Sequence, residues 1–402
     1  MEKVVITGMG AVCSLGDSVG ELWDNLLAGK SGFGKIERIS TENHDSTVAA
    51  EIKNSEGFES VCKKYWTRRQ LNTVTGPQRL VLATAVEAIE DCGIDLENYD
   101  KDRVAVIYGI ADAGFEDAER EKMTNIILKS MPSSAPSLIS EKFGFHGASF
   151  NLSCACASSG YAIALGAQLI ETGVYDMVIA GGVSNYVTHD NISGFNQILA
   201  MSANPDPETA SRPFTKNRDG FIFGEGAGSV VLESETSAKK RNAKVHAKLS
   251  GYACYSESSN MTAPLEDGEG MRIVMERALK KAGVSPDSVD YINAHGTSTY
   301  LNDKYETTAI KNLFGKHAYE LSVSSTKSAI GHTLAAGSVI EGIVTIKALN
   351  ENIVPPTIHY DVPDPELDLD YTPNTAKKRE INTAMSNSYG FGGQNVSLVF
   401  EK

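Results

Sequence analysis

The sequence predicts an α/β protein, and three observations lead to that prediction. Short β-branched and apolar runs bounded by glycine recur along the chain, as in buried strands. Segments with apolar residues at helical spacing, such as Leu80–Asp91, lie between these runs. The length of 402 residues is also large for one simple core, so two domains or a duplicated one are expected.

The expected strands, in chain order, are Val4–Thr7, Val104–Tyr108, Met177–Ala180, Ser229–Glu233, Tyr291–Asn293, Ser322–Ser325 and Val396–Phe400. Two further helices are expected over Ala157–Glu171 and Thr333–Leu349, both rich in small residues and both shortly after a strand. That parallel indicates an internal duplication. The charged segment Glu233–Ala243 has the composition of a loop, so we expect one half over residues 1–238 and another over residues 239–402.

The bulk composition excludes several classes of protein. A net charge of -14 argues against general nucleic-acid binding, which needs a basic face. No apolar stretch approaches the ~18 residues of a membrane span. The six cysteines are too sparse for a disulfide scaffold, and the start of the chain lacks the features of a signal peptide. We therefore expect a cytoplasmic protein with reduced thiols, no membrane and no nucleic-acid partner.

Three short motifs resemble binding sites but do not complete them. Gly8-Met9-Gly10 begins like a dinucleotide fingerprint, but Cys13 stands where the third glycine belongs. Gly29-Lys30-Ser31 resembles the end of a phosphate loop, but Asp24 replaces the required earlier glycine. Cys154 and Cys156 have no second Cys/His pair at ligand spacing, so no metal site is expected.

Cys156 is the first candidate for chemistry. It stands among small residues, in Ser153-Cys154-Ala155-Cys156-Ala157-Ser158, at a strand end just before a helix. A helix N-terminus favours a thiolate, and small neighbours would admit a thioester. The alternative is a buried, inert cysteine.

Three further segments carry residue types that could complete a site. His295 follows an expected strand and precedes Gly-Thr-Ser-Thr, although a lone histidine is commonly structural. Lys327 and His332 lie five residues apart where the next helix begins, and the simple alternative for Lys327 is a solvated charge. Phe391 lies in a glycine-rich loop whose N–H groups could bind an oxyanion, or which could be a plain turn.

The combination of these segments in this order resembles the elongating β-ketoacyl-[acyl-carrier-protein] synthases of the thiolase-like superfamily. The resemblance runs nearly from end to end. It also includes Val4–Val12, Arg212-Pro213-Phe214, Arg218-Asp219-Gly220-Phe221 and Gly224-Glu225-Gly226-Ala227-Gly228. It implies the thiolase fold, in which two similar α/β halves form five layers, and it implies a homodimer or a heterodimer with a related subunit.

The resemblance also implies a reaction and the roles of four residues. Cys156, in the N-terminal half, would take an acyl group from an acyl carrier protein. His295 and His332, in the C-terminal half, would bind the malonyl thioester carbonyl during decarboxylation, with Lys327 supplying positive charge. The presence of a second histidine favours an elongating enzyme over an initiating one. A degradative thiolase would need a second cysteine near the C-terminus, and the sequence has none after Cys254.

Other residues are assigned by the same resemblance. Thr297 and Thr299 would bind the phosphopantetheine arm, which belongs to the carrier protein, so no cofactor of the chain's own is expected. Phe391 would act as a gate, and its N–H would share an oxyanion hole with that of Cys156. Three acids would support the site: Asp303, Glu306 and Glu341.

Docking of an acidic carrier protein would need basic residues, and the best cluster consists of Lys63, Lys64, Arg68 and Arg69. The chain departs from its relatives at Leu199 and Ala203, in a stretch where many of them carry arginines, and over Ala111–Phe145, which is shorter. Two alternatives stay open: a non-condensing partner subunit resembling a chain-length factor, and a malonyl-carrier decarboxylase. Acyl chain length and pathway, fatty acid or specialised polyketide, are not indicated by the sequence.

Overall fold

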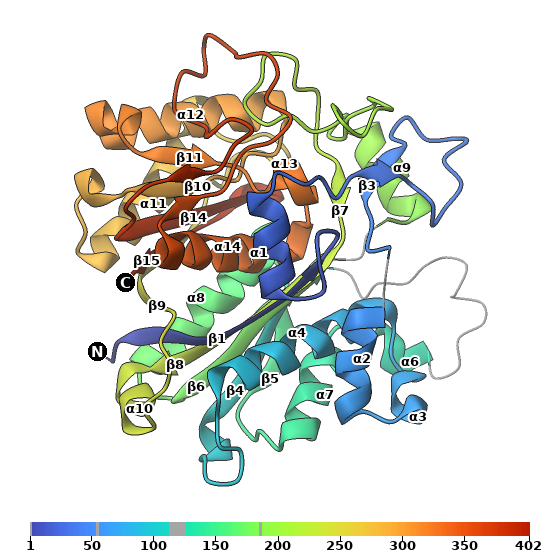
Figure 1. The fold of residues 1–402 in the computed structure, drawn as a ribbon, viewed down its shortest axis with the longest axis vertical. Helices are drawn as coiled ribbons and strands as arrows, with labels where there is room; N and C mark the ends of the chain where they lie inside the picture. Colours follow the sequence, from blue (N-terminus) through green and yellow to red (C-terminus); the bar gives the residue numbers. More distant parts are fainter. Residues whose placement is uncertain (1, 54–55, 112–125, 185–186) are drawn as a thin grey trace.

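A ten-stranded sheet runs through the computed structural model, which describes residues 2–53, 56–111, 126–184 and 187–402 (Figure 1). In sheet order, its first five strands are β5 (Ser149–Leu152), β4 (Val104–Ile110), β6 (Met177–Ser184), β8 (Gly226–Ser234) and β1 (Val4–Cys13). The next five are β9 (Ala247–Ser256), β15 (Gln394–Glu401), β14 (Thr383–Gly390), β10 (Tyr291–Asn293) and β11 (Ser322–Ser324).

The two sets of five strands have the same topology. In each set the strand that is third in the chain lies at the outer edge, followed by the second, fourth, fifth and first. The outer three strands of each set are parallel, and the inner neighbours are antiparallel. Among the described strands, the sets pair with each other where β1 meets β9, at Val5–Lys248 and Ile6–Ala247. The predicted duplication is therefore confirmed in the order and direction of the strands.

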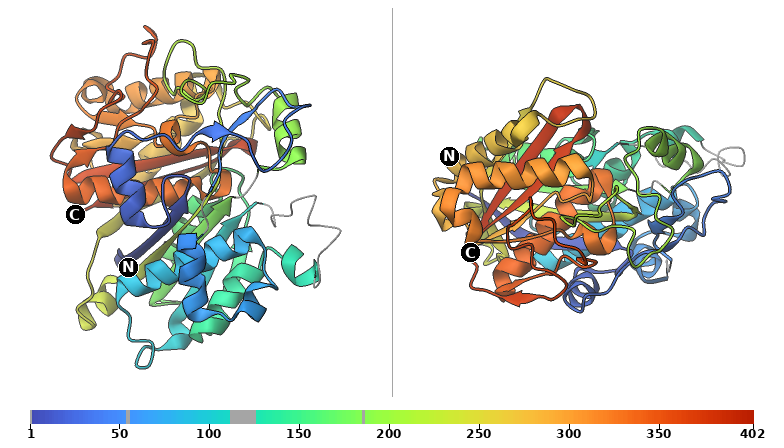
Figure 2. Two further views of the ribbon diagram at one scale, coloured as in Figure 1. Left: turned by 45° about the vertical axis from the view of Figure 1, so that its right-hand side comes forward. Right: turned by 90° about the horizontal axis from the view of Figure 1, so that it is seen from above.

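Helices form three layers around these two units. Helices α8 (Ser158–Glu171) and α14 (Gly337–Glu351) lie between the units and contact strands of both. On the outer faces, α4 (Gly76–Cys92) packs on β1 and β8, while α11 (Glu269–Ala282) packs on β9 and β15 (Figure 2). This is the predicted five-layered arrangement.

The sequences of the central helices explain their position. Residues Gly337–Ile346 of α14 are all buried, and most of them are small or apolar, so this helix has to be covered on every side. Gly160 lets α8 approach its neighbours, because a Cβ there would lie 2.5 Å from Val396 and 3.0 Å from Ser338. The outer helix α11 instead keeps a charged face, on which Arg272 pairs with Glu269 and Glu276.

Smaller elements complete the described chain. The remaining helices are α1 (Val19–Leu27), α2 (Glu56–Tyr65), α3 (Arg68–Leu71), α6 (Ile126–Ser130), α7 (Ser134–Phe143), α9 (His189–Gln197), α10 (Glu235–Lys240), α12 (Tyr300–Phe314) and α13 (Lys327–Ile330). The short strands are β2 (Gly34–Lys35), β3 (Val48–Ala50), β7 (Phe223–Gly224), β12 (Ile353–Val354) and β13 (Lys377–Lys378). No helix of the described ranges is long and apolar enough to cross a bilayer.

Most expected elements lie inside observed ones, but the loop expected over Glu233–Ala243 is wrong. This segment contains the end of β8 and the helix α10. The Ser234 hydroxyl caps α10 by accepting the N–H of Ser237 at 3.1 Å, and Ala238 is buried. The predicted division between residues 238 and 239 falls within this helix and stays a prediction. Of the segment Ala111–Phe145, residues 112–125 lie outside the described residues.

Candidate active site

A cavity of about 320 Å³ brings together six of the seven predicted site residues. Those that line it are Cys156, His295, His332, Thr297, Thr299 and Phe391. Lys327, the seventh, is buried and lowers the pKa of both histidines and of the Cys156 thiol through its charge. Segments from both halves of the chain therefore meet at one place.

Cys156 lies in the tight connection from β5 to α8, one residue before the N-cap Ala157. Ala155 has a φ of 47°, and this rare conformation for alanine turns the chain sharply into the helix. The Ser158 hydroxyl holds the turn, since it donates to Ala155 O at 2.6 Å and accepts the N–H of Cys154 at 2.8 Å. The thiol itself is buried, with 8% of Cys156 exposed.

Burial controls the ionisation of this thiol. It raises the pKa of Cys156 to about 11, against the lowering effects of the Lys327 charge and of the N–H groups of Phe391 and Cys156. The helix end was expected to favour a thiolate, but desolvation outweighs it, so the pKa of about 11 favours the neutral thiol at rest. The two N–H groups that face the sulfur are the same pair that was expected to form the oxyanion hole.

His332 has a defined tautomer. Its Nδ1 accepts the N–H of Leu334 at 3.3 Å, so the ring proton is on Nε2. The backbone N–H of His332 donates to Ile222 O at 2.7 Å. This bond fixes the backbone next to Gly331, whose φ is 71°. Burial and the nearby charge of Lys327 lower the pKa of His332 well below its usual value, so the ring is neutral.

His295 lies beside His332, with the two ring centroids 5.3 Å apart and nearly perpendicular. The carboxylate of Glu306 accepts the N–H groups of His295 and Gly296, each at 2.8 Å, and so fixes this loop. Burial, Lys327 and His332 lower the pKa of His295 well below its usual value. Both rings are therefore neutral hydrogen-bonding groups rather than cations.

Lys327 forms a buried ion pair with Glu341. Its Nζ lies 2.5 Å from Glu341 Oε1, and both side chains are 1% exposed. The simple alternative of a solvated lysine is therefore wrong. The pKa of Glu341 is raised to about 7, because the effect of burial exceeds the opposing effect of the Lys327 charge. Lys327 thus brings a buried positive charge close enough to act on the cavity residues.

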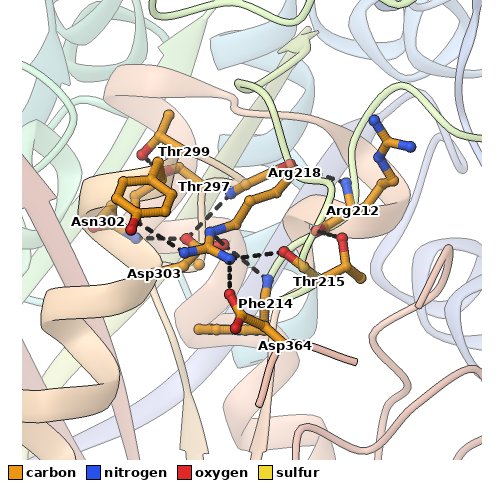
Figure 3. Close-up of polar contacts among 12 residues, drawn as sticks. Arg212, Phe214, Thr215, Arg218, Thr297, Thr299, Asn302, Asp303 and Asp364 are labelled. Atoms are coloured by element: carbon orange, nitrogen blue, oxygen red, sulfur yellow. Dashed lines mark hydrogen bonds and ion pairs between the residues drawn. The ribbon is translucent and has the colours of Figure 1, made fainter. Parts of the chain in front are cut away.

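Thr297 and Thr299 form one wall of the cavity, and their hydroxyl oxygens lie 2.9 Å apart. The loop between them is held by Asp303, which accepts the N–H of Ser298 at 3.2 Å. The buried guanidinium of Arg218 lies behind this loop, 3.8 Å from Asp303 in an ion pair (Figure 3). Arg218 belongs to the motif Arg218-Asp219-Gly220-Phe221, but its local sequence indicates no role, and only the fold shows that it supports this wall.

Phe391 is half-buried in a loop that has two glycines at positive φ, Gly392 at 76° and Gly393 at 70°. Its ring stacks on Phe195 of α9, with centroids 6.1 Å apart. Phe195 was missed by the sequence analysis, because nothing in its local sequence indicates contact with a loop 196 residues away, from Phe195 to Phe391. The gating role of Phe391 stays a prediction.

The predicted basic cluster does not reach the cavity. Lys63 and Lys64 are exposed on α2, and Arg68 and Arg69 are exposed on α3, but none of the four lines the cavity. Lys63 pairs with Glu59 at 3.1 Å. Their part in docking stays a prediction. Within the described ranges, no group of three or more His, Cys, Asp or Glu side chains is arranged to hold a metal ion.

The fold and the Cys-His-His cavity define a condensing enzyme of the thiolase type, and the chain belongs to the β-ketoacyl synthase family. Residues 1–238 match the N-terminal domain of β-ketoacyl synthases, and residues 246–361 match the C-terminal domain. The chain is 40% identical to 3-oxoacyl-[acyl-carrier-protein] synthase 2 of Staphylococcus aureus (strain N315), over 100% of this chain and 98% of that protein.

Solved structures agree with this assignment. A type II polyketide ketosynthase, AntDE, in complex with its acyl-carrier protein AntF, matches with a TM-score of 0.88 and 32% identity, covering 100% of this chain and 99% of that one. The ishigamide ketosynthase/chain length factor matches with a TM-score of 0.90 and 29% identity, with the same coverage. The predicted family and fold are thus confirmed.

Proposed function

We propose that this chain catalyses the decarboxylative condensation of an acyl group on Cys156 with a malonyl-carrier thioester, giving a β-ketoacyl-carrier thioester. The observation that carries the proposal is the cavity itself. It places one thiol facing two backbone N–H groups, next to two neutral histidines over a buried lysine. No cofactor of the chain's own takes part in the steps below, since the phosphopantetheine arm arrives on the carrier protein.

In the first step the sulfur of Cys156 attacks the acyl-carrier thioester. The N–H groups of Cys156 and Phe391 bind the negative oxygen of the tetrahedral intermediate. The carbon–sulfur bond to the carrier breaks, the carrier leaves as a thiol, and the acyl group stays on Cys156. Because the resting thiol is neutral, its proton accompanies the leaving sulfur.

In the second step a malonyl-carrier thioester enters the same cavity. The Nε2–H of His332 and a ring N–H of His295 donate to its thioester carbonyl, and the buried charge of Lys327 favours the negative charge that develops there. Carbon dioxide leaves, and the resulting enolate carbon attacks the acyl carbon on Cys156. Collapse of that intermediate releases the β-ketoacyl carrier and a Cys156 thiolate, which solvent protonates.

The retained cysteine separates this proposal from the two alternatives. A partner subunit that only shapes a chamber has no need of a thiol facing two N–H groups, and a simple decarboxylase has no need of an acyl-binding cysteine. The proposed partners are an acyl carrier protein and a second ketosynthase-like subunit, identical or related.

Intact-protein mass spectrometry tests the proposal. Incubation with an acyl-carrier thioester should add one acyl mass, mapped to Cys156, and later addition of malonyl-carrier thioester should remove it and yield the β-ketoacyl carrier. Release of carbon dioxide without any adduct would instead support the decarboxylase.

A further inference from the structure

Exposed apolar side chains gather at the opening of the cavity. Among the exposed large hydrophobic residues of the described chain, five line this cavity: Ile198, Leu199, Met261, Tyr300 and Leu301. We call these five residues the mouth rim. Leu199 and Met261 are the most exposed of all, at 85% and 75%. Such a concentration at one opening is typical of an interaction site rather than of scattered surface residues.

The mouth rim has almost no charge. The described lining of the cavity contains no lysine or arginine, and its one carboxylate, Glu257, is buried and accepts hydrogen bonds from Leu265 N and Asn395 Nδ2, each at 2.8 Å. Lys304, which lies 5.8 Å from the Tyr300 ring, pairs with Glu366. Arg218 and Lys304, the cations beside Tyr300, are both held in ion pairs, so the described lining offers a strongly acidic surface no basic partner of its own.

The structure holds both sides of the mouth rim in place. Arg218 lies under the Tyr300 ring, 5.0 Å from its centroid, and donates to Tyr300 O at 3.2 Å. The ion pair of Arg218 with Asp364, at 2.7 Å, fixes the guanidinium (Figure 3). On the other side Leu199 has a φ of 54°, a conformation that leucine rarely adopts. A strained and exposed leucine contributes nothing to the core, and such outliers mark functional surfaces.

We propose that the mouth rim is the docking surface for a carrier protein that presents apolar side chains, rather than acidic ones, around the serine that bears its phosphopantetheine. This proposal rests on the proposed function, because a protein-borne arm has to enter through this opening to reach Cys156. The apolar rim fits an apolar partner surface, and the absence of lysine and arginine among the described lining residues disfavours an acidic one. The carrier is therefore a dedicated one, selected by apolar contact.

The test compares two routes of acylation. The variants Leu199→Ser and Leu301→Ser should raise the KM for the acyl-carrier thioester by about tenfold or more, with kcat nearly unchanged. Acylation of Cys156 by a small acyl-pantetheine thioester, which needs no docking, should change by less than about twofold. Val174→Ser, an exposed apolar residue away from the cavity, is the matched control and should leave both rates unchanged.

Salt dependence gives a second readout. The KM for the carrier should stay nearly constant as ionic strength rises, since salt screens ion pairs but not apolar contacts. A KM that rises steeply with salt, or one that is unaltered in both variants, would overturn the proposal.

An equal loss of acylation by acyl-pantetheine would show that these residues shape the cavity instead. A dimer that dissociates in the variants would assign the rim to a second copy. Failure of the unaltered protein to be acylated by either thioester would contradict the proposed function itself.

Discussion

The two halves of the chain use one topology for different chemistry. In the N-terminal half, the third strand β5 passes directly into the central helix α8, and the short turn carries Cys156. In the C-terminal half, the third strand β11 reaches the central helix α14 through a longer segment that holds Lys327 and His332. The duplicated fold thus supplies two equivalent connections, one with the proposed nucleophile Cys156 and one with the proposed hydrogen-bond donor His332.

The two connections meet because the starts of the central helices meet. The N–H of Val339 donates to the Ser159 hydroxyl at 3.0 Å, and Gly160 lies against Ser338. Each half alone would hold half of the site. In the proposed mechanism the acyl group is held by Cys156 of the N-terminal half, and the malonyl group is decarboxylated at the histidines of the C-terminal half. The following predictions test whether these two steps can be separated.

The largest expected effect comes from the N-terminal connection. Cys156→Ala should lower condensation by about 10³-fold or more, because no other group there can hold the acyl chain. Decarboxylation of malonyl-carrier thioester, measured as released carbon dioxide, should persist because the histidines are intact. Cys154→Ala, two residues away and outside the cavity lining, is the control. Loss of both activities in Cys156→Ala would contradict the separation.

The next largest effect comes from the C-terminal connection. His332→Ala should lower condensation by about 10²-fold to 10³-fold, since it removes a donor to the developing enolate. Acylation of Cys156, followed by mass spectrometry, should remain. His317→Ala, outside the cavity, should leave both steps intact. If His332→Ala blocked acylation but kept carbon dioxide release, the assigned roles would be reversed.

A pH profile sharpens the link between the halves. With a Cys156 pKa of about 11, alkylation of this thiol by iodoacetamide should rise about tenfold per pH unit without a plateau below pH ~10. The double variant Lys327→Met with Glu341→Gln removes the charge pair without leaving a buried charge, and its alkylation at fixed pH should be slower. A plateau near neutral pH would mean that the resting group is a thiolate.

The smallest effect concerns packing between the halves. Gly160→Ala would place a Cβ 2.5 Å from Val396, so it should lower the free energy of unfolding by about 1–3 kcal/mol. Gly194→Ala in α9, where the added Cβ would meet no atom of another segment within 4 Å, should be neutral or slightly stabilising. Denaturant titration of both variants measures the difference, and an equal response would mean that the close contact at Gly160 is relieved elsewhere.

The sequence predicted the alternation of elements well, because buried strands such as β4 and β6 are continuous apolar runs. It missed β9 and β14, whose mixed polar residues give no clear pattern, and it assumed a strand before Cys154 without giving bounds for β5. The cysteine, the histidines and Phe391 were identified because they stand in specific motifs. The support of Arg218, the stack of Phe195 on Phe391 and the exposed rim around Leu199 arise from distant segments brought together by folding, which local sequence does not encode.

The central claim is that the acyl group held by one half is joined to the carbon unit activated by the other. A single-turnover chase tests it most directly. The protein is first acylated with an isotopically labelled acyl-carrier thioester, freed of excess substrate, and then mixed with unlabelled malonyl-carrier thioester. The account predicts that the label leaves Cys156 and appears in the β-ketoacyl carrier together with one carbon dioxide per turnover. Label that stays on Cys156, or leaves as free acid, while carbon dioxide is released would contradict it.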